Sequence, residues 1–145
     1  MLNGLKFARM ALLVASFFLY AVSVQAQEPA PKLLAAGEFH KVEKTGKGTA
    51  AVYELADGKR ILRLSNFESE NGPDLHVRLI AADDATDTAM AGKTEYVEVG
   101  KLKGNKGNQN YALPPNLDLG KYRVVSIWCN RFSVNFAAAP LKAEK

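Results

Sequence analysis

The chain has 145 residues, 48% of them hydrophobic and 23% charged, which is long enough for one domain with a single core and too short for two. Its formal net charge is only +4 and its basic residues are dispersed along the sequence, so neither a nucleic-acid partner nor a membrane-surface partner is indicated. The single cysteine excludes an internal disulfide.

The N-terminus has the pattern of a cleavable signal peptide. Lys6 and Arg9 form a basic region, residues 10–22 form an apolar core, and Val24 and Ala26 are small residues at positions −3 and −1. The apolar run is short for a membrane span and has no stop-transfer flank, so we expect cleavage after Ala26 in preference to a retained anchor. Cleavage removes two bases and no acids, which lowers the formal net charge to +2. The sequence therefore predicts an exported protein, periplasmic or extracellular, with no membrane attachment after cleavage.

From Gly37 onward the hydrophobic pattern has a period of two residues, punctuated by glycine and proline, with no convincing amphipathic helix. This pattern predicts about eight short strands in an all-β domain, an antiparallel sandwich or barrel. We expect residues 1–26 to be the signal peptide, 27–36 a flexible lead, 37–141 the domain and 142–145 a frayed tail. The expected strands are 38–43, 49–55, 60–66, 75–81, 95–102, 109–113, 122–129 and 132–137.

The alternation is clearest in the expected strand 75–81. Leu75, Val77 and Leu79 share one face and are expected to be buried, whereas His76 and Arg78 point the other way and are expected to be largely exposed. The following residues, 82–94, are polar and follow neither the helical nor the strand period. The simplest interpretation of that stretch is a solvated loop, although its Met90 is apolar.

The expected strand 122–129 has no plainly polar face. We therefore expect a central strand, covered by the second sheet on one side and by loops on the other. Asn130 and Arg131 separate it from the alternating run 132–137, which predicts a hairpin with a two-residue turn. One face carries Val125, Ile127 and Cys129, and the other carries Tyr122, Val124, Ser126 and Trp128.

Five blocks of sequence follow one another along the chain: GEF (37–39), LRLSNF (62–67), GPDL (72–75), GKLKGNKGNQNY (100–111) and VSIWC (125–129) followed by residues 132–141. In this order they resemble the DM-thirteen domain of Skeletor-type extracellular proteins, which often lies beside a haem-binding-like DOMON domain. The resemblance covers about residues 37–141. It implies an all-β domain with a proposed electron-transfer role, in which the family's single characteristic cysteine, here Cys129, is the redox-active group.

Cys129 is thus the first candidate for chemistry, although a cysteine on a strand is more often a small buried hydrophobe than a reactive group. A free thiol is a liability outside the cell, which favours a role for it. Its expected place at a strand end predicts a partly accessible thiol, with a pKa lowered if Arg131 folds back over the turn. Without a second cysteine, a redox cycle needs an external partner, either a protein or a small molecule, or a bound cofactor.

The sequence requires no cofactor, but it contains residues of the types that bind copper or haem. Two histidines, His40 and His76, with Cys129 and Met90 have the ligand types of a blue-copper site, although no histidine follows the cysteine as that site requires. The same residues are the candidate axial ligands for haem, and no Cys-x-x-Cys-His motif exists for covalent attachment. We expect the histidines and the cysteine not to converge.

Motifs of conventional hydrolases and transferases are absent from the sequence, so an enzyme of those classes is not indicated. Two functions from different classes remain. One is an exported electron-transfer domain acting through Cys129. The other is a non-catalytic extracytoplasmic binding or adhesion module, which uses its loops and keeps the cysteine for structure.

Overall fold

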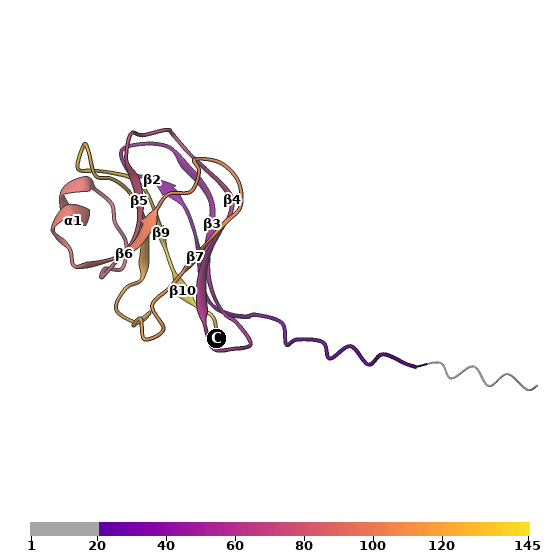
Figure 1. The fold of residues 1–145 in the computed structure, drawn as a ribbon. Helices are drawn as coiled ribbons and strands as arrows, with labels where there is room; N and C mark the ends of the chain where they lie inside the picture. The colour runs from indigo at the N-terminus through magenta and orange to yellow at the C-terminus, as the bar shows by residue number, and fades with distance from the viewer. Residues whose placement is uncertain (1–20) are drawn as a thin grey trace, which may run out of the picture.

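The computed structural model describes residues 21–145 and shows two five-stranded antiparallel sheets that face each other without closing into a barrel (Figure 1). The predicted all-β sandwich is confirmed. The first sheet contains, in spatial order, β10 (Lys142–Ala143), β1 (Lys32–Glu38), β3 (Gly46–Glu54), β4 (Arg60–Ser69) and β7 (Gln109–Ala112). The second contains β2 (His40–Lys41), β9 (Val134–Pro140), β8 (Val124–Cys129), β5 (Leu75–Ile80) and β6 (Tyr96–Lys101).

The ends of the domain differ from the expectation. The predicted signal peptide lies mostly outside the described residues, and residues 21–31 have no regular secondary structure and lead away from the sandwich (Figure 1). The prediction of a flexible lead is wrong for residues 32–36, because β1 begins at Lys32 and pairs with β3. The prediction of a frayed tail is wrong for Lys142 and Ala143, which form β10 and pair with β1. The two ends pair with each other across the whole domain, and a local pattern does not reveal such long-range pairing.

The facing sides of the two sheets form the main hydrophobic core. Leu62 and Leu64 of β4 face this core and are fully buried. On β5, Val77 and Leu79 are fully buried and Leu75 is 8% exposed, which confirms the buried face predicted for this strand. The period-two pattern therefore identified correctly which side of β5 faces inward.

The sheets come closest where small residues face each other. A methyl group added at Gly46 of β3 would lie 2.2 Å from Cβ of Ala137, on β9 of the opposite sheet. Ala137 is followed by two further alanines in β9, and all three are fully buried. A larger side chain at Gly46 would push the sheets apart.

β8 is central in the second sheet and is buried at all of its positions, as expected for a strand covered on both faces. Its outer face, which points away from the first sheet, is covered by the segment predicted as a solvated loop. That prediction is wrong, because the segment contains α1 (Thr88–Lys93), whose first turn is capped by the Asp87 carboxylate accepting from the Met90 amide at 2.7 Å. A helix this short shows no helical period in the sequence. Its residue Ala91 belongs to a second hydrophobic cluster, and Met90 packs against that cluster. The other buried members are Ile80, Ala85, Val124, Trp128 and Ala138.

Within residues 21–145, no helix is long and apolar enough to cross a membrane. The second hairpin strand, β9, starts at Val134 and not at residue 132, and Val134 pairs with Cys129. The connection is therefore the four-residue loop 130–133, and the predicted two-residue turn is wrong. Ser133 adopts a left-handed conformation (φ 52°) in this loop, while the side chain of Phe132 is 60% exposed.

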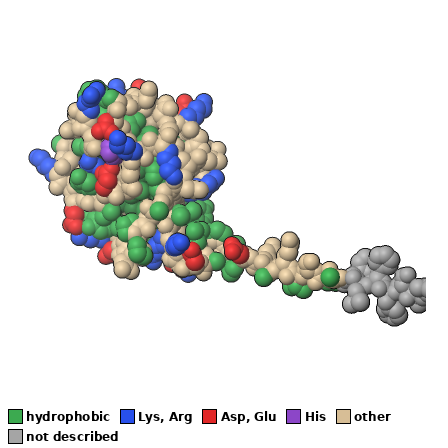
Figure 2. Space-filling model, in the orientation of Figure 1, with side chains coloured by type: hydrophobic (Ala, Val, Ile, Leu, Met, Phe, Trp, Pro, Cys, Tyr) green, Lys and Arg blue, Asp and Glu red, His purple; other side chains and the backbone are tan. Residues whose placement is uncertain are grey.

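Charged side chains are spread over the surface. On the face seen in Figure 2, single Lys and Arg side chains alternate with Asp and Glu side chains. Some opposite charges pair directly, as Lys121 Nζ does with Glu95 Oε1 at 2.9 Å. This face therefore offers no broad area of one charge.

We predict that Gly46→Ala destabilises the fold, because the new methyl group overlaps Ala137 and core overpacking costs about 1–3 kcal/mol. Chemical denaturation of the two proteins measures the loss. Gly104→Ala is the matched control, since its methyl group would meet nothing closer than 3.7 Å, and it should change stability by less than about 0.5 kcal/mol. Equal stability of Gly46→Ala and the unmodified protein would contradict the close approach.

Candidate functional site

Cys129 is the last residue of β8 and its side chain points into the main core. The thiol is free, and the residue is 0% exposed. Its neighbours in the sheet are Leu75 of β5 and Val134 of β9. The expectation of a partly accessible thiol is therefore wrong, because the side chain lies among the apolar residues of the main core and not at the rim. Gly72 packs there so closely that an added methyl group would lie 2.9 Å from Leu75 and 3.0 Å from Phe136.

Arg131, the expected partner of the thiol, is exposed in the loop 130–133. Within the described residues it forms no hydrogen bond or ion pair that would fix its guanidinium, and the structure does not bring it to the buried sulfur. The residue before it, Asn130, is held instead. Its amide nitrogen donates to the Asp74 carbonyl oxygen at 2.9 Å, and its side-chain oxygen accepts from Arg78 Nη2 at 2.7 Å.

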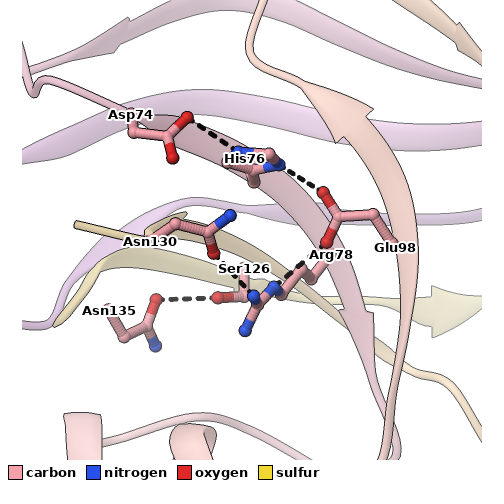
Figure 3. A network of polar contacts seen from close by, with 7 residues as sticks. All are labelled: Asp74, His76, Arg78, Glu98, Ser126, Asn130 and Asn135. Carbon is pink, nitrogen blue, oxygen red and sulfur yellow. Dashed lines mark hydrogen bonds and ion pairs between the residues drawn. The ribbon is translucent and has the colours of Figure 1, made fainter. Parts of the chain in front are cut away.

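A closed network of polar contacts lies on the outer face of the second sheet, beside the Cys129 end (Figure 3). His76 Nε2 contacts Asp74 Oδ1 at 2.8 Å, and His76 Nδ1 contacts Glu98. Glu98 Oε2 accepts from Arg78 Nε at 3.2 Å, and Arg78 donates to Asn130. Because Asn130 also bonds to the backbone of Asp74, the contacts form a ring, which we call the clasp: Asp74, His76, Arg78, Glu98 and Asn130.

The two basic side chains of the clasp are largely buried, so the expectation that they are exposed is wrong. The side chain of His76 is 12% exposed and that of Arg78 is 11% exposed. The period-two pattern correctly places them on the outer face, but it does not predict what covers that face. The Arg78 guanidinium lies 4.0 Å from the ring centroid of Tyr96 and 4.9 Å from that of Trp128, in cation–π contact with both.

Trp128 and its neighbours connect the clasp to the helical cover. The ring of Trp128 lies against α1, where a methyl group added at Gly92 would be 3.1 Å from it. On the same face, the Ser126 hydroxyl donates to the side-chain oxygen of Asn135 at 2.9 Å, and the backbone nitrogen of Asn135 donates to the Thr88 hydroxyl of α1 at 3.1 Å. Asn135 is fully buried and its side-chain nitrogen has no partner within the described chain.

The candidate metal ligands lie in separate environments. His40 contacts Asp84 at 2.7 Å, and His76 belongs to the clasp. Cys129 lies in the core between the sheets, whereas Met90 packs on the outer cluster, on the opposite side of the second sheet. The described part of the chain contains no group of three His, Cys, Asp or Glu side chains suited to a metal ion. The residues present therefore do not assemble the donor set of a blue-copper centre or a pair of haem ligands.

A shallow cleft of about 300 Å³ opens at the same end of the sandwich. Two sequence blocks that carry the resemblance meet there, residues 72–75 and residues 100–111. Leu75 lies in its wall and is the neighbour of Cys129 in the sheet. Polar side chains in the lining are Asn71, Asp74, Lys101 and Asn105.

The family model described as Electron transfer DM13 matches residues 38–141. The chain belongs to the electron transfer DM13 family. A search of curated proteins found no match. A search of solved structures found none either. The match runs from the last residue of β1 to the residue before β10, so it spans the other eight strands of this DM13 chain and includes Cys129, the clasp and the cleft.

Sequence reasoning missed the clasp of the DM13 domain. The alternation of strand 75–81 treats His76 and Arg78 as separate exposed positions and links neither to Asp74, Glu98 or Asn130. The sequence did contain a signal. The expected strand 75–81 carries two basic residues, and the expected strand 122–129 is apolar and aromatic on both faces, so its side chains could cover those basic residues if the two strands were neighbours. The register, in which His76 lies beside Trp128 and Arg78 beside Ser126, was needed to show it.

The His40–Asp84 pair should make stability depend on pH. Burial lowers the pKa of His40, but the hydrogen bonds to Asp84 and to the Lys41 carbonyl outweigh it, so the pKa lies above its ordinary value. A raised folded-state pKa adds stability that is full below about pH 6.5 and is lost as pH rises through the folded-state pKa. We predict a loss of less than about 1 kcal/mol between pH 5 and pH 8, as for other partly exposed ion pairs.

Denaturation across this pH range measures that effect, with His40→Gln and Asp84→Asn as the variants. Both should flatten the same part of the stability profile, because each removes one member of the pair. A His40→Gln profile parallel to that of the unmodified protein would contradict the assignment.

Proposed function

We propose that this DM13 chain is an exported electron-transfer domain that acts through Cys129 with an external redox partner. Three observations support the proposal: the family to which the chain belongs, the presence of a single thiol, and the signal-peptide pattern at the N-terminus. The family match is the observation that carries it. The partner is a protein or a small molecule.

The chemistry available to one thiol is limited. A disulfide within the chain cannot form, so a one-electron cycle is the simplest. In the oxidising direction, the Cys129 thiol gives one electron to the oxidised partner and, when local opening admits water to the sulfur, gives its proton to that water, which leaves a thiyl radical. In the reverse direction, a reduced partner returns the electron and water returns the proton.

The position of the thiol is compatible with a partner at the clefted end of the domain. Leu75 lines the cleft and is the cross-strand neighbour of Cys129, and neighbouring Cα atoms in an antiparallel pair are about 4.5–5.5 Å apart. A redox group bound in the cleft would therefore be separated from the sulfur by little more than one side chain. Such a separation permits electron transfer without direct contact.

A non-catalytic binding or adhesion module is the second candidate. The full burial of Cys129 among apolar neighbours favours it, because this is the usual environment of a structural cysteine. In that function the loops around the cleft would bind a partner and the thiol would only fill space.

Cys129→Ala separates the two functions. The variant should stay folded, since it loses one sulfur atom from the core, and it should lose the electron exchange seen by protein-film voltammetry in the unmodified protein. Circular dichroism confirms that the fold is kept. A folded Cys129→Ala protein with an unchanged voltammetric response would refute the thiol as the redox group.

Export is tested by the intact mass of the protein recovered from the exported fraction of an expression host. We expect a chain that begins at Gln27, because Val24 and Ala26 provide the small residues that signal peptidase requires. Ala26→Leu is the matched variant and should prevent cleavage. Recovery of the full-length chain from the cytosol alone would contradict export.

A further inference from the structure

The contacts of the clasp converge on the two loops that adjoin Cys129 at the end of β8. One loop, residues 70–74, ends at Asp74, whose carboxylate is held by His76. The other, residues 130–133, is held at Asn130 by Arg78 and by the Asp74 carbonyl. The two loops are therefore fastened to each other and to the outer face of β5, directly beside the strand end that carries the thiol (Figure 3).

Arg78 is the central member of this arrangement. Its guanidinium bonds to Glu98 and to Asn130, and it is held between the rings of Tyr96 and Trp128. With a side chain only 11% exposed, it is shielded from the solvent that weakens surface ion pairs. Removing it would free the side chain of Asn130, leaving that residue held only through its backbone bond to the Asp74 carbonyl, and would leave Glu98 with His76 as its only partner in the clasp.

The loop 130–133 has few other attachments. Phe132 is 60% exposed, Ser133 adopts a left-handed conformation that non-glycine residues disfavour, and the exposed Arg131 forms no hydrogen bond or ion pair within residues 21–145. Apart from the strands that flank it, the loop is held through Asn130. A segment with so few contacts can open locally without unfolding of the domain.

We propose that Arg78 is a positioning residue that controls access to Cys129, because it keeps the loops of residues 70–74 and 130–133 closed over the thiol. Opening of the clasp releases Asn130, moves the loop 130–133 away and exposes the sulfur while both sheets stay folded. The importance of this for electron transfer depends on the proposed function, whereas the control of access does not.

Native-state labelling of Cys129 with the aromatic disulfide DTNB tests the proposal. Labelling rates are measured at increasing urea concentration, because local opening exposes little surface and depends weakly on urea, whereas global unfolding depends steeply on it. For the unmodified protein we expect a weak dependence at low urea. Arg78→Gln should raise the rate at low urea by tenfold or more and keep the weak dependence.

Arg60→Gln is the matched control. Arg60 is also a partly buried arginine, bonded to the Leu117 carbonyl at 3.0 Å and paired with Glu54 at 3.6 Å, but it starts β4 at the other end of the sandwich. Its loss should lower global stability without raising labelling at low urea. Equilibrium denaturation of each variant gives the rate that global unfolding alone would produce.

The proposal is overturned if Arg78→Gln labels no faster at low urea than its loss of global stability explains. Voltammetry of the same proteins separates this result from the proposed function. Faster labelling of Arg78→Gln with no electron exchange in any variant supports the clasp and refutes electron transfer. Electron exchange through Cys129 with no effect of Arg78→Gln on labelling supports electron transfer and overturns the clasp.

Discussion

The burial of β8 on both faces is the constraint on which the rest of the second sheet depends. One face is covered by the first sheet, which is usual for a sandwich and places Cys129 in the core. The other face carries Val124 and Trp128, which need a cover of their own. The chain supplies two: α1 packs on one part of this face, and Arg78 of the neighbouring strand lies over the ring of Trp128.

The clasp follows from this arrangement. A guanidinium held between two rings has lost much of its water, and such a charge is tolerated only when carboxylates and hydrogen-bond acceptors replace that water. Glu98 and Asn130 provide them for Arg78, and Asp74 and Glu98 contact the two ring nitrogens of His76. Because the members form a ring, the loss of one removes a contact from two others. Arg78, which covers Trp128 of the apolar strand β8, thereby also helps to connect the loops 70–74 and 130–133, which are distant in sequence.

The sequence predicts the sandwich and the inner face of β5 from the local alternation of apolar and polar residues, and it predicts the double burial of β8 from the lack of a polar face in that strand. It does not predict β10, which depends on pairing with Ala35 and Ala36 at the other end of the domain. Nor does it predict α1, whose six residues are too few to show a period, although Asp87 before them is a typical helix cap. The candidate site divides in the same way: Cys129 is evident from composition, but its burial and the clasp depend on the register of β5 and β8.

A fully buried thiol and a redox role are compatible in an exported protein. In an oxidising compartment an exposed thiol forms mixed disulfides and sulfur oxides, and it then ceases to be a reversible one-electron group. Burial prevents these side reactions, because they require the attacking atom to touch the sulfur, whereas an electron can cross the width of a side chain such as that of Leu75. The same burial would be the ordinary consequence of packing if Cys129 were structural. The two functions therefore make different demands on this end of the domain. Electron transfer requires a redox partner within about a side chain's width of the buried sulfur, whereas a binding module requires only that the loops around the cleft keep their positions.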